Sequence, residues 1–152
     1  MYYGENGIGC NSIISSGLAM SNRPSATSLG ITIHSAVLTA PQDVLPTWLT
    51  SGNDAKRITS RYGSEMVDAI NLLALTLPGA AIIQQGDELG AADTILEWAT
   101  SSTCWPHPAV SSASPFPWDD SVNGGFTSGE PWLPLATNYR YANAKTEFKN
   151  DF

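Results

Sequence analysis

The sequence predicts an α/β fold in which short buried strands run parallel and helices connect them. Two segments carry this prediction: residues 48–63, WLTSGNDAKRITSRYG, and residues 77–90, LPGAAIIQQGDELG. Each contains a short apolar run followed by a polar turn with an aspartate, the pattern at the carboxyl edge of a parallel α/β barrel. Because these edges of parallel strands form one rim, we expect Asp54, Asp87 and Glu88 to lie near one another.

The first half of the chain is predicted to hold a helix followed by a strand. A helix is expected over residues 25–38, where Leu29, Ile33 and Val37 recur every four residues. Two prolines then break the chain, and residues 43–50 are short and apolar, as in a buried strand.

A second helix and strand follow. Ser64 is predicted to cap a helix that runs to about Leu77. The apolar face of this helix is expected to contain Met66, Ile70, Leu73 and Leu77. Pro78 and Gly79 end the helix, and residues 80–84 form a compact apolar strand. The order strand, helix, strand predicts a parallel pair with a right-handed crossover.

The last part of the chain has a different character. From residue 91 onward the sequence is rich in Ser, Pro and Gly, with Trp and Phe set among them. A long loop with aromatic residues is more often functional or partner-facing than a linker. We therefore divide the chain into residues 1–90, with the strands and helices, and residues 91–152, a long loop region.

Composition excludes several classes of function. A net charge of −7 and no basic patch argue against a nucleic-acid partner. No run of about 18 apolar residues is present, and residues 1–10 lack the features of a signal peptide. Cys10 and Cys104 stand outside any zinc or disulfide framework; we expect two free thiols, with a single bridge as the alternative.

No cofactor or metal is predicted. His34 lies in a helical segment and His107 lies between two prolines, so neither belongs to a ligand set. The acids of Trp118–Asp119–Asp120 are too few for a calcium cage. The sequence contains no phosphate-binding loop and no nucleotide fingerprint.

Four segments resemble motifs of the α-amylase superfamily (glycoside hydrolase family 13), in its oligo-1,6-glucosidase and maltase branch. Residues 48–63 resemble the seventh-strand motif, W-x-x-G-N-H-D-x-x-R-x-x-S-R-x-G, and residues 77–90 resemble the eighth-strand motif. Residues 114–126, SPFPWDDSVNGGF, and 131–135, PWLPL, are similar to two motifs that follow. The resemblance implies the C-terminal part of a (β/α)8 TIM barrel, about strands six to eight, plus a long Pro-, Ser- and Trp-rich loop region.

The resemblance also implies roles for three residues. Asp54 stands at the position of the acid that stabilises the transition state. Asn53 and Arg57 stand at substrate-binding positions, although Asn53 replaces the family's histidine and Gly52 its asparagine. Without the resemblance, Asp54 is predicted to hydrogen-bond the backbone in a turn after a strand. Glu88 is predicted to stabilise the loop that follows residues 80–84.

The departures from the family pattern favour a particular group of relatives. Ala113 stands where the maltases carry an arginine, and Pro117 stands where they carry a glutamine. In this detail the chain is most similar to the heavy subunits of heteromeric amino-acid transporters. That resemblance implies a catalytically silent domain at the extracellular face of the plasma membrane, with a light-chain transporter as partner.

Two alternatives remain. The chain could be part of an active, secreted or membrane-bound α-glucosidase that acts on α-linked glucose oligosaccharides, or a truncated barrel that begins at Met1 and has no function alone. Retaining hydrolysis requires two carboxyl groups about 5–5.5 Å apart. In the superfamily these come from strands four and five, outside the matched motifs, so we do not expect this chain alone to hydrolyse a glycosidic bond.

Overall fold

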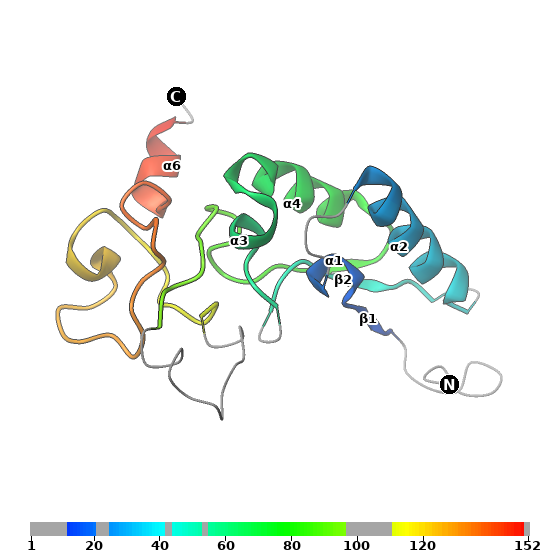
Figure 1. Ribbon diagram of the computed structural model, residues 1–152, viewed down its shortest axis with the longest axis horizontal. Helices are drawn as coiled ribbons and strands as arrows, with labels where there is room; N and C mark the ends of the chain where they lie inside the picture. The colour runs from blue at the N-terminus through cyan, green and yellow to red at the C-terminus, as the bar shows by residue number, and fades with distance from the viewer. Residues whose placement is uncertain (1–11, 21–24, 42–43, 53–54, 97–110, 151–152) are drawn as a thin grey trace.

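A computed structural model describes residues 12–20, 25–41, 44–52, 55–96 and 111–150 (Figure 1). The blue-to-green part of the chain contains three short strands with their helices, and the yellow-to-red part lies at the opposite end. We call the described part of residues 12–96 the barrel segment and residues 111–150 the C-terminal lobe.

Three strands form one parallel sheet, in which the last two are the parallel pair that the sequence predicts. The strands are β1 (Ile14–Ser15), β2 (Thr47–Leu49) and β3 (Ala80–Ile82), in the order β1-β2-β3. Trp48, at the centre of β2, is fully buried, and its indole N–H donates to the carbonyl of Pro78 at 2.9 Å. This bond links the centre of β2 to Pro78, two residues before β3 begins. It also satisfies the only polar group of the buried indole.

The first long helix confirms the predicted range. Helix α2 spans Ala26–Thr39, and the Ser25 hydroxyl caps it by accepting from the Ser28 N–H at 3.1 Å. None of its residues is buried. The short helix α1 (Gly17–Met20), which the sequence did not predict, precedes it and buries Leu18.

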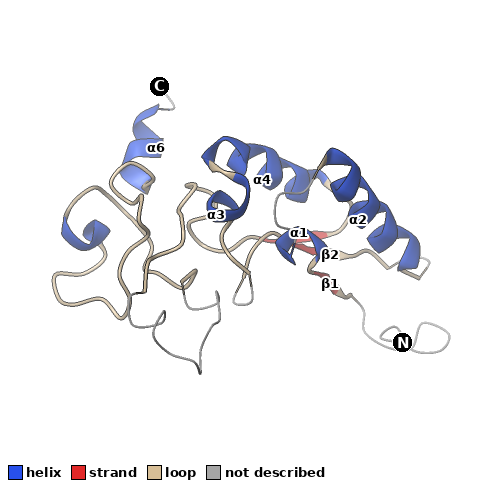
Figure 2. Ribbon diagram, viewed as in Figure 1, coloured by secondary structure: helices blue, strands red, loops and turns tan. Residues whose placement is uncertain are grey.

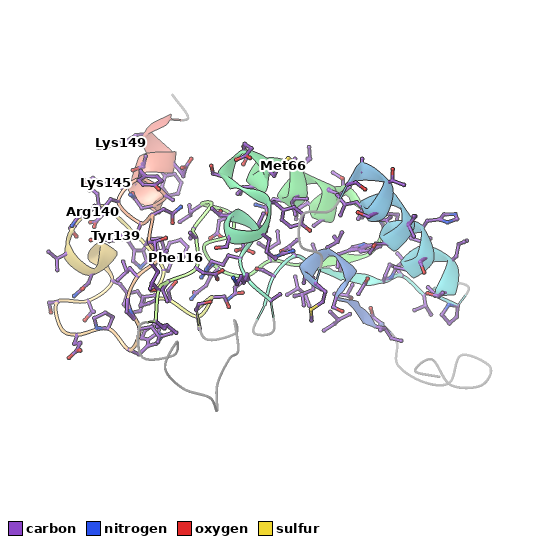
Figure 3. All side chains as sticks on the ribbon, viewed as in Figure 1. Met66, Phe116, Tyr139, Arg140, Lys145 and Lys149 are labelled. Atoms are coloured by element: carbon purple, nitrogen blue, oxygen red, sulfur yellow. The ribbon has the colours of Figure 1, made fainter. Side chains whose placement is uncertain are left out.

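The second long helix differs from its prediction in two respects. Ser64 does not cap it; Ser64 begins the 3₁₀ turn η2 (Ser64–Met66), and helix α4 spans Val67–Thr76. The predicted apolar face is confirmed at Ile70 and wrong at Met66. The buried residues of α4 are Val67, Ile70 and Ala74, while Met66 is 37% exposed and lies near the start of the helix (Figure 3). Met66 belongs to the 3₁₀ turn, so Val67 is the first buried residue of the helix.

A short helix between β2 and η2 was not predicted. Helix α3 spans Ile58–Tyr62 and ends at Gly63, whose φ of 92° is favourable only for glycine. Ile58 packs with Val67 and Ile70 in the apolar core, and the partly buried Leu29 and Tyr62 cover it. In Figure 2, α2 and α4 both lie above the strands.

The C-terminal lobe contains mostly turns and loops. It also has a 3₁₀ turn, η4 (Val122–Gly125), and a helix that the sequence did not predict, α6 (Ala144–Asn150). Its buried apolar side chains include Ala136, Ala142 and Ala144 together with Pro115 and Pro117. Small side chains bury little apolar area, so we expect hydrogen bonds to contribute much of the stability of this lobe.

Candidate functional site

The polar residues that follow β2 and β3 meet at one rim of the sheet. Asn53 and Asp54 lie outside the described residues. The residues on either side of them are joined, because the Ala55 N–H donates to the carbonyl of Gly52 at 3.1 Å. Two residues after Ala55, Arg57 precedes the first residue of α3 (Ile58–Tyr62).

Arg57 is 1% exposed and its guanidinium binds protein groups. Nη1 donates to the carbonyl of Gln85 at 2.7 Å and to Oδ1 of Asp87 at 3.3 Å. Nη2 donates to the carbonyl of Ser112 at 2.8 Å. Nε is buried with no hydrogen-bond partner. The side chain therefore links the segments after β2 and β3 to the C-terminal lobe, and these bonds leave its terminal nitrogens engaged within the protein.

Asp87 is the buried acid of the rim, at 1% exposed. Its carboxylate pairs with Arg57 and accepts a hydrogen bond from the hydroxyl of Ser51. Burial raises the pKa of the Asp87 carboxyl above its ordinary 3.8, against the Ser51 bond and the charge of Arg57, which lower it. The ionised form is thus disfavoured by loss of water and favoured by two specific partners.

A second buried arginine lies one helical turn after the first. Arg61 donates from Nε to the carbonyl of Lys56 at 2.7 Å and from Nη1 to that of Leu18 at 2.9 Å. Its Nη2 donates to the carbonyl of Thr50, and its guanidinium lies 4.7 Å from the ring centre of Tyr62. Arg61 therefore ties α3 to α1 and to the end of β2.

The remaining acids near the rim bind groups of the protein itself. Glu88 is exposed, and its Oε2 accepts from the N–H of Gly86 at 2.7 Å. Asp93 accepts from the backbone N–H of Arg57 at 3.3 Å. Glu88 thus stabilises its own turn, and Asp93 holds the start of α3.

The residues excluded as metal ligands remain apart from this rim where they are described. His34 is exposed on α2, and His107 lies outside the described residues. Asp119 accepts from the Ser121 N–H at 2.9 Å, and Asp120 pairs with Lys145 at 2.9 Å. Within the ranges that the structure describes, no group of three or more His, Cys, Asp or Glu residues is arranged to hold a metal ion.

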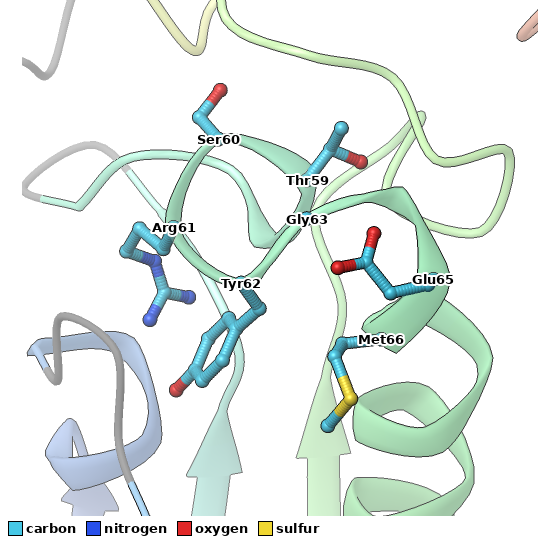
Figure 4. Close-up of a pocket in the computed structure, with 7 residues that line it drawn as sticks. All are labelled: Thr59, Ser60, Arg61, Tyr62, Gly63, Glu65 and Met66. Atoms are coloured by element: carbon cyan, nitrogen blue, oxygen red, sulfur yellow. The ribbon is translucent and has the colours of Figure 1, made fainter.

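An open pocket of about 560 Å³ lies beside the rim, on α3 and η2 (Figure 4). Its lining comprises Thr59, Ser60, Arg61, Tyr62, Gly63, Glu65 and Met66. All three guanidinium nitrogens of Arg61 donate to carbonyls of the protein, so this charged group has a structural role beside the pocket. We find no reactive pair of side chains in this lining.

Sequence reasoning missed the partner of Arg57. Asp87 was expected at the same rim, but no pairing between the two was predicted. Ser51 and Ser112 were not singled out at all. The spacing of the two motifs was a usable signal, because Ser51 and Asp87 each follow a parallel strand by a few residues and such positions converge.

The sequence matches the family described as Alpha amylase, catalytic domain, over residues 15–152. Maltase A1 of Drosophila melanogaster is 36% identical over 120 residues, which cover 72% of this chain and 21% of that protein. The Rattus norvegicus protein named Amino acid transporter heavy chain SLC3A1 is 35% identical over 126 residues, which cover 80% of this chain and 18% of the relative. The chain therefore spans about a fifth of the length of these relatives.

A solved structure agrees with these sequence relatives. The α-glucosyl transfer enzyme XgtA has a TM-score of 0.79 and 27% identity, and the match covers 99% of this chain and 29% of XgtA. None of the helices in the described part of the chain is long and apolar enough to cross a membrane. From the family match and these relatives, the chain belongs to the α-amylase family of glycoside hydrolase-type catalytic domains.

Proposed function

We propose that this chain is the last part, about strands six to eight, of an α-glucosidase-like barrel that has lost catalysis and serves as the scaffold of an amino-acid transporter heavy subunit. In this proposal residues 1–90 supply the last strands and helices, and residues 91–152 supply the region after strand eight. One observation carries the proposal. Gly52 and Asn53 replace the asparagine and histidine of the family pattern, next to a rim whose buried charged groups bind one another.

The acids at the described part of the rim are not assigned to the chemistry of glycoside hydrolysis. A retaining glycosidase needs one carboxylate free to attack and a second carboxyl group to donate a proton. Asp87 is buried against Ser51 and Arg57, and Glu88 binds the amide of Gly86. We assign both residues structural roles, since in the family pattern the two reacting acids come from strands four and five. Asp54 would supply only the stabilising acid.

Substrate recognition is weakened in the same region. Asn53 has an amide in place of the imidazole that would bind a sugar hydroxyl, and Ala113 has no side chain that can donate a hydrogen bond. Arg57, predicted to contact substrate, donates to carbonyls of the protein and to Asp87. We propose that Arg57 organises the rim in this chain and that Asn53 is a remnant of the sugar site.

The relatives supply the partner class. The rat protein is named an amino acid transporter heavy chain, and by that likeness we propose that the full-length protein associates with a light-chain transporter at the extracellular face of the plasma membrane. No nucleic-acid partner is proposed, because the chain carries a net charge of −7.

The second candidate is an active maltase or α-glucosidase, secreted or bound to a membrane. Its support is the 36% identity with Maltase A1 and the presence of Asp54, Arg57 and the QGDELG turn. Its substrate would be an α-linked glucose oligosaccharide, hydrolysed by the retaining mechanism with two further acids from other strands.

The test is delivery of a light chain to the cell surface. The full-length gene product is expressed with a light-chain transporter in cells that lack a heavy subunit, and surface light chain and amino-acid uptake are measured. The rat heavy chain serves as the positive control. Increased uptake supports the scaffold proposal. No increase, together with hydrolysis of maltose by the same protein, supports the maltase instead.

A further inference from the structure

The C-terminal lobe meets the barrel segment through polar junctions. The described apolar core of Ile58, Val67 and Ile70 lies wholly within the barrel segment. The hydrogen bonds between the two parts gather around Ser112 and around Asn138. Directional bonds of this kind fix an orientation, because each has a narrow range of distance and angle.

The junction at Ser112 joins three parts of the rim. The Ser112 carbonyl accepts from Nη2 of Arg57 and from Nε2 of Gln84, each at 2.8 Å. The Ser112 hydroxyl donates to the carbonyl of Gly52 at 3.3 Å. Beside it, the Thr94 N–H donates to the carbonyl of Ser111 at 3.0 Å. Residues 111–112 are therefore held at the carboxyl ends of both β2 and β3.

The junction at Asn138 is separate from the first. Its Oδ1 accepts from the Ala92 N–H at 2.8 Å, and its Nδ2 donates to the carbonyl of Gly90 at 2.9 Å. Asn138 is buried, and both ends of its amide are bonded. The lobe would thus stay attached through Asn138 if the junction at Ser112 were loosened.

We propose that Arg57 is a positioning residue that sets where residues 111–114 lie against the turn after β2, and so sets the shape of the rim. Its planar guanidinium donates from Nη1 to Asp87 and the Gln85 carbonyl and from Nη2 to the Ser112 carbonyl. The single ammonium of a lysine cannot reproduce this arrangement. The site is built around the guanidinium: a Cβ on Gly86, where φ is 89°, would lie 3.1 Å from Nη1.

This role extends beyond the proposed scaffold function. The next residue, Ala113, offers its carbonyl to the indole N–H of Trp132 at 3.0 Å, so residues 112–113 are held from both sides. Arg57 therefore sets where the segment after Ala113, which carries Phe116 and Trp118, begins. It would do so in a silent domain and in an active glucosidase alike.

The test is Arg57→Lys in the full-length gene product, followed by residue-resolved hydrogen exchange. Three backbone amides report on three bonds: Thr94 on the Ser112 junction, Ala92 on the Asn138 junction, and Leu77, which donates to Leu73, on helix α4. We expect the Thr94 amide to exchange faster by about tenfold or more. The Ala92 and Leu77 amides should keep their rates.

The matched control is Arg140→Lys. Arg140 is exposed on the lobe (Figure 3), so the same chemical change should leave all three amides unaffected. An unchanged Thr94 rate in Arg57→Lys, or an equal rise at all three amides, overturns the positioning role. If Arg57→Lys gives no folded protein, Asp87→Asn removes the ionic partner and keeps the side-chain shape. It must raise exchange at Thr94 alone, and any other pattern overturns the role. Neither readout depends on light-chain delivery, so the positioning role and the proposed function can fail independently.

Discussion

Arg57 and Asp87 face each other across the rim, Nη1 to Oδ1, at 3.3 Å, with their side chains 1% and 0% exposed. The two residues come from different segments, one after β2 and one after β3. A charge pair removed from water is costly to break, because the group left behind keeps its charge and loses its partner. The stability of the barrel segment therefore depends on both residues together.

Replacing Arg57 with alanine should destabilise the protein strongly. The change leaves Asp87 buried without its ionic partner and also removes the Arg57 bonds to the Gln85 and Ser112 carbonyls. We expect the free energy of unfolding to fall by about 3–5 kcal/mol, measured by urea unfolding. The exposed Arg140→Ala should change it by about 0.5 kcal/mol or less. Equal effects of the two substitutions would contradict the structural role of the buried Arg57 side chain in joining Gln85, Asp87 and Ser112.

The raised pKa of Asp87 predicts a pH dependence of stability. The folded protein binds this proton more tightly than the unfolded chain, whose carboxyl has the ordinary pKa of 3.8. The contribution of Asp87 to stability therefore declines as pH rises from about 3.8 through the raised pKa, and is constant above it. Asp87→Asn lacks this contribution.

The measurement is the free energy of unfolding of both proteins across that pH range. The value for the wild type minus the value for Asp87→Asn should decrease as pH rises and then level off. A difference that increases with pH over the same range would mean that the pairing with Arg57 outweighs burial and that the pKa is lowered.

Two glycines should respond in opposite directions to alanine. Gly79 has a φ of 119°, and a Cβ there would collide with the carbonyl oxygen of Pro46. Gly30 lies within α2 and has open space around it. We expect Gly79→Ala to cost at least about 2 kcal/mol and Gly30→Ala to stabilise by about 0.5–1 kcal/mol. Thermal unfolding of the two variants tests this, and a neutral Gly79→Ala would be inconsistent with the close approach of the chain before β2 to the start of β3.

Asn138 should matter more than its neighbours in the lobe. Asn138→Ala removes the bonds to Ala92 and Gly90. The half-buried Ala92 N–H loses its acceptor, while the Gly90 carbonyl keeps its bond from the Thr59 hydroxyl at 2.7 Å. We expect a loss of about 2 kcal/mol in urea unfolding. Thr137→Ala, at the exposed adjacent position, is the control and should have little effect.

Restoring one family residue should not restore chemistry. Asn53→His replaces the amide with the imidazole of the family pattern, but hydrolysis also needs a nucleophile and an acid. We expect no maltose hydrolysis by this variant of the full-length gene product, measured by glucose release. Appreciable release would show that the other catalytic groups are intact and would contradict the silent-domain proposal.

Two of the three parallel strands and the first long helix could be predicted from the sequence because their signals are local. The apolar runs around Trp48 and Ala81 and the cap at Ser25 depend on a few adjacent residues. The inward face of α4 was predicted correctly at Ile70 but not at Met66, because Met66 lies in the 3₁₀ turn that begins at Ser64.

The candidate site was predicted only at the level of which residues share a rim. The pairing of Arg57 with Asp87 joins positions thirty residues apart, and the bond to Ser112 joins positions fifty-five apart. Such partners depend on strand order and loop path, which a pattern of residue types does not specify. Helix α6 was missed because its sequence, AKTEFKN, has little apolar periodicity.

The most direct test of the central claim is an α-glucosidase assay of the purified full-length gene product. The protein is incubated with p-nitrophenyl α-glucoside, with Maltase A1 of Drosophila melanogaster as the active control and Asp54→Asn as the matched variant. We predict no release of nitrophenol above the buffer blank by either form of this protein. Release by the wild type that disappears in Asp54→Asn would contradict the account and identify the domain as an active glucosidase.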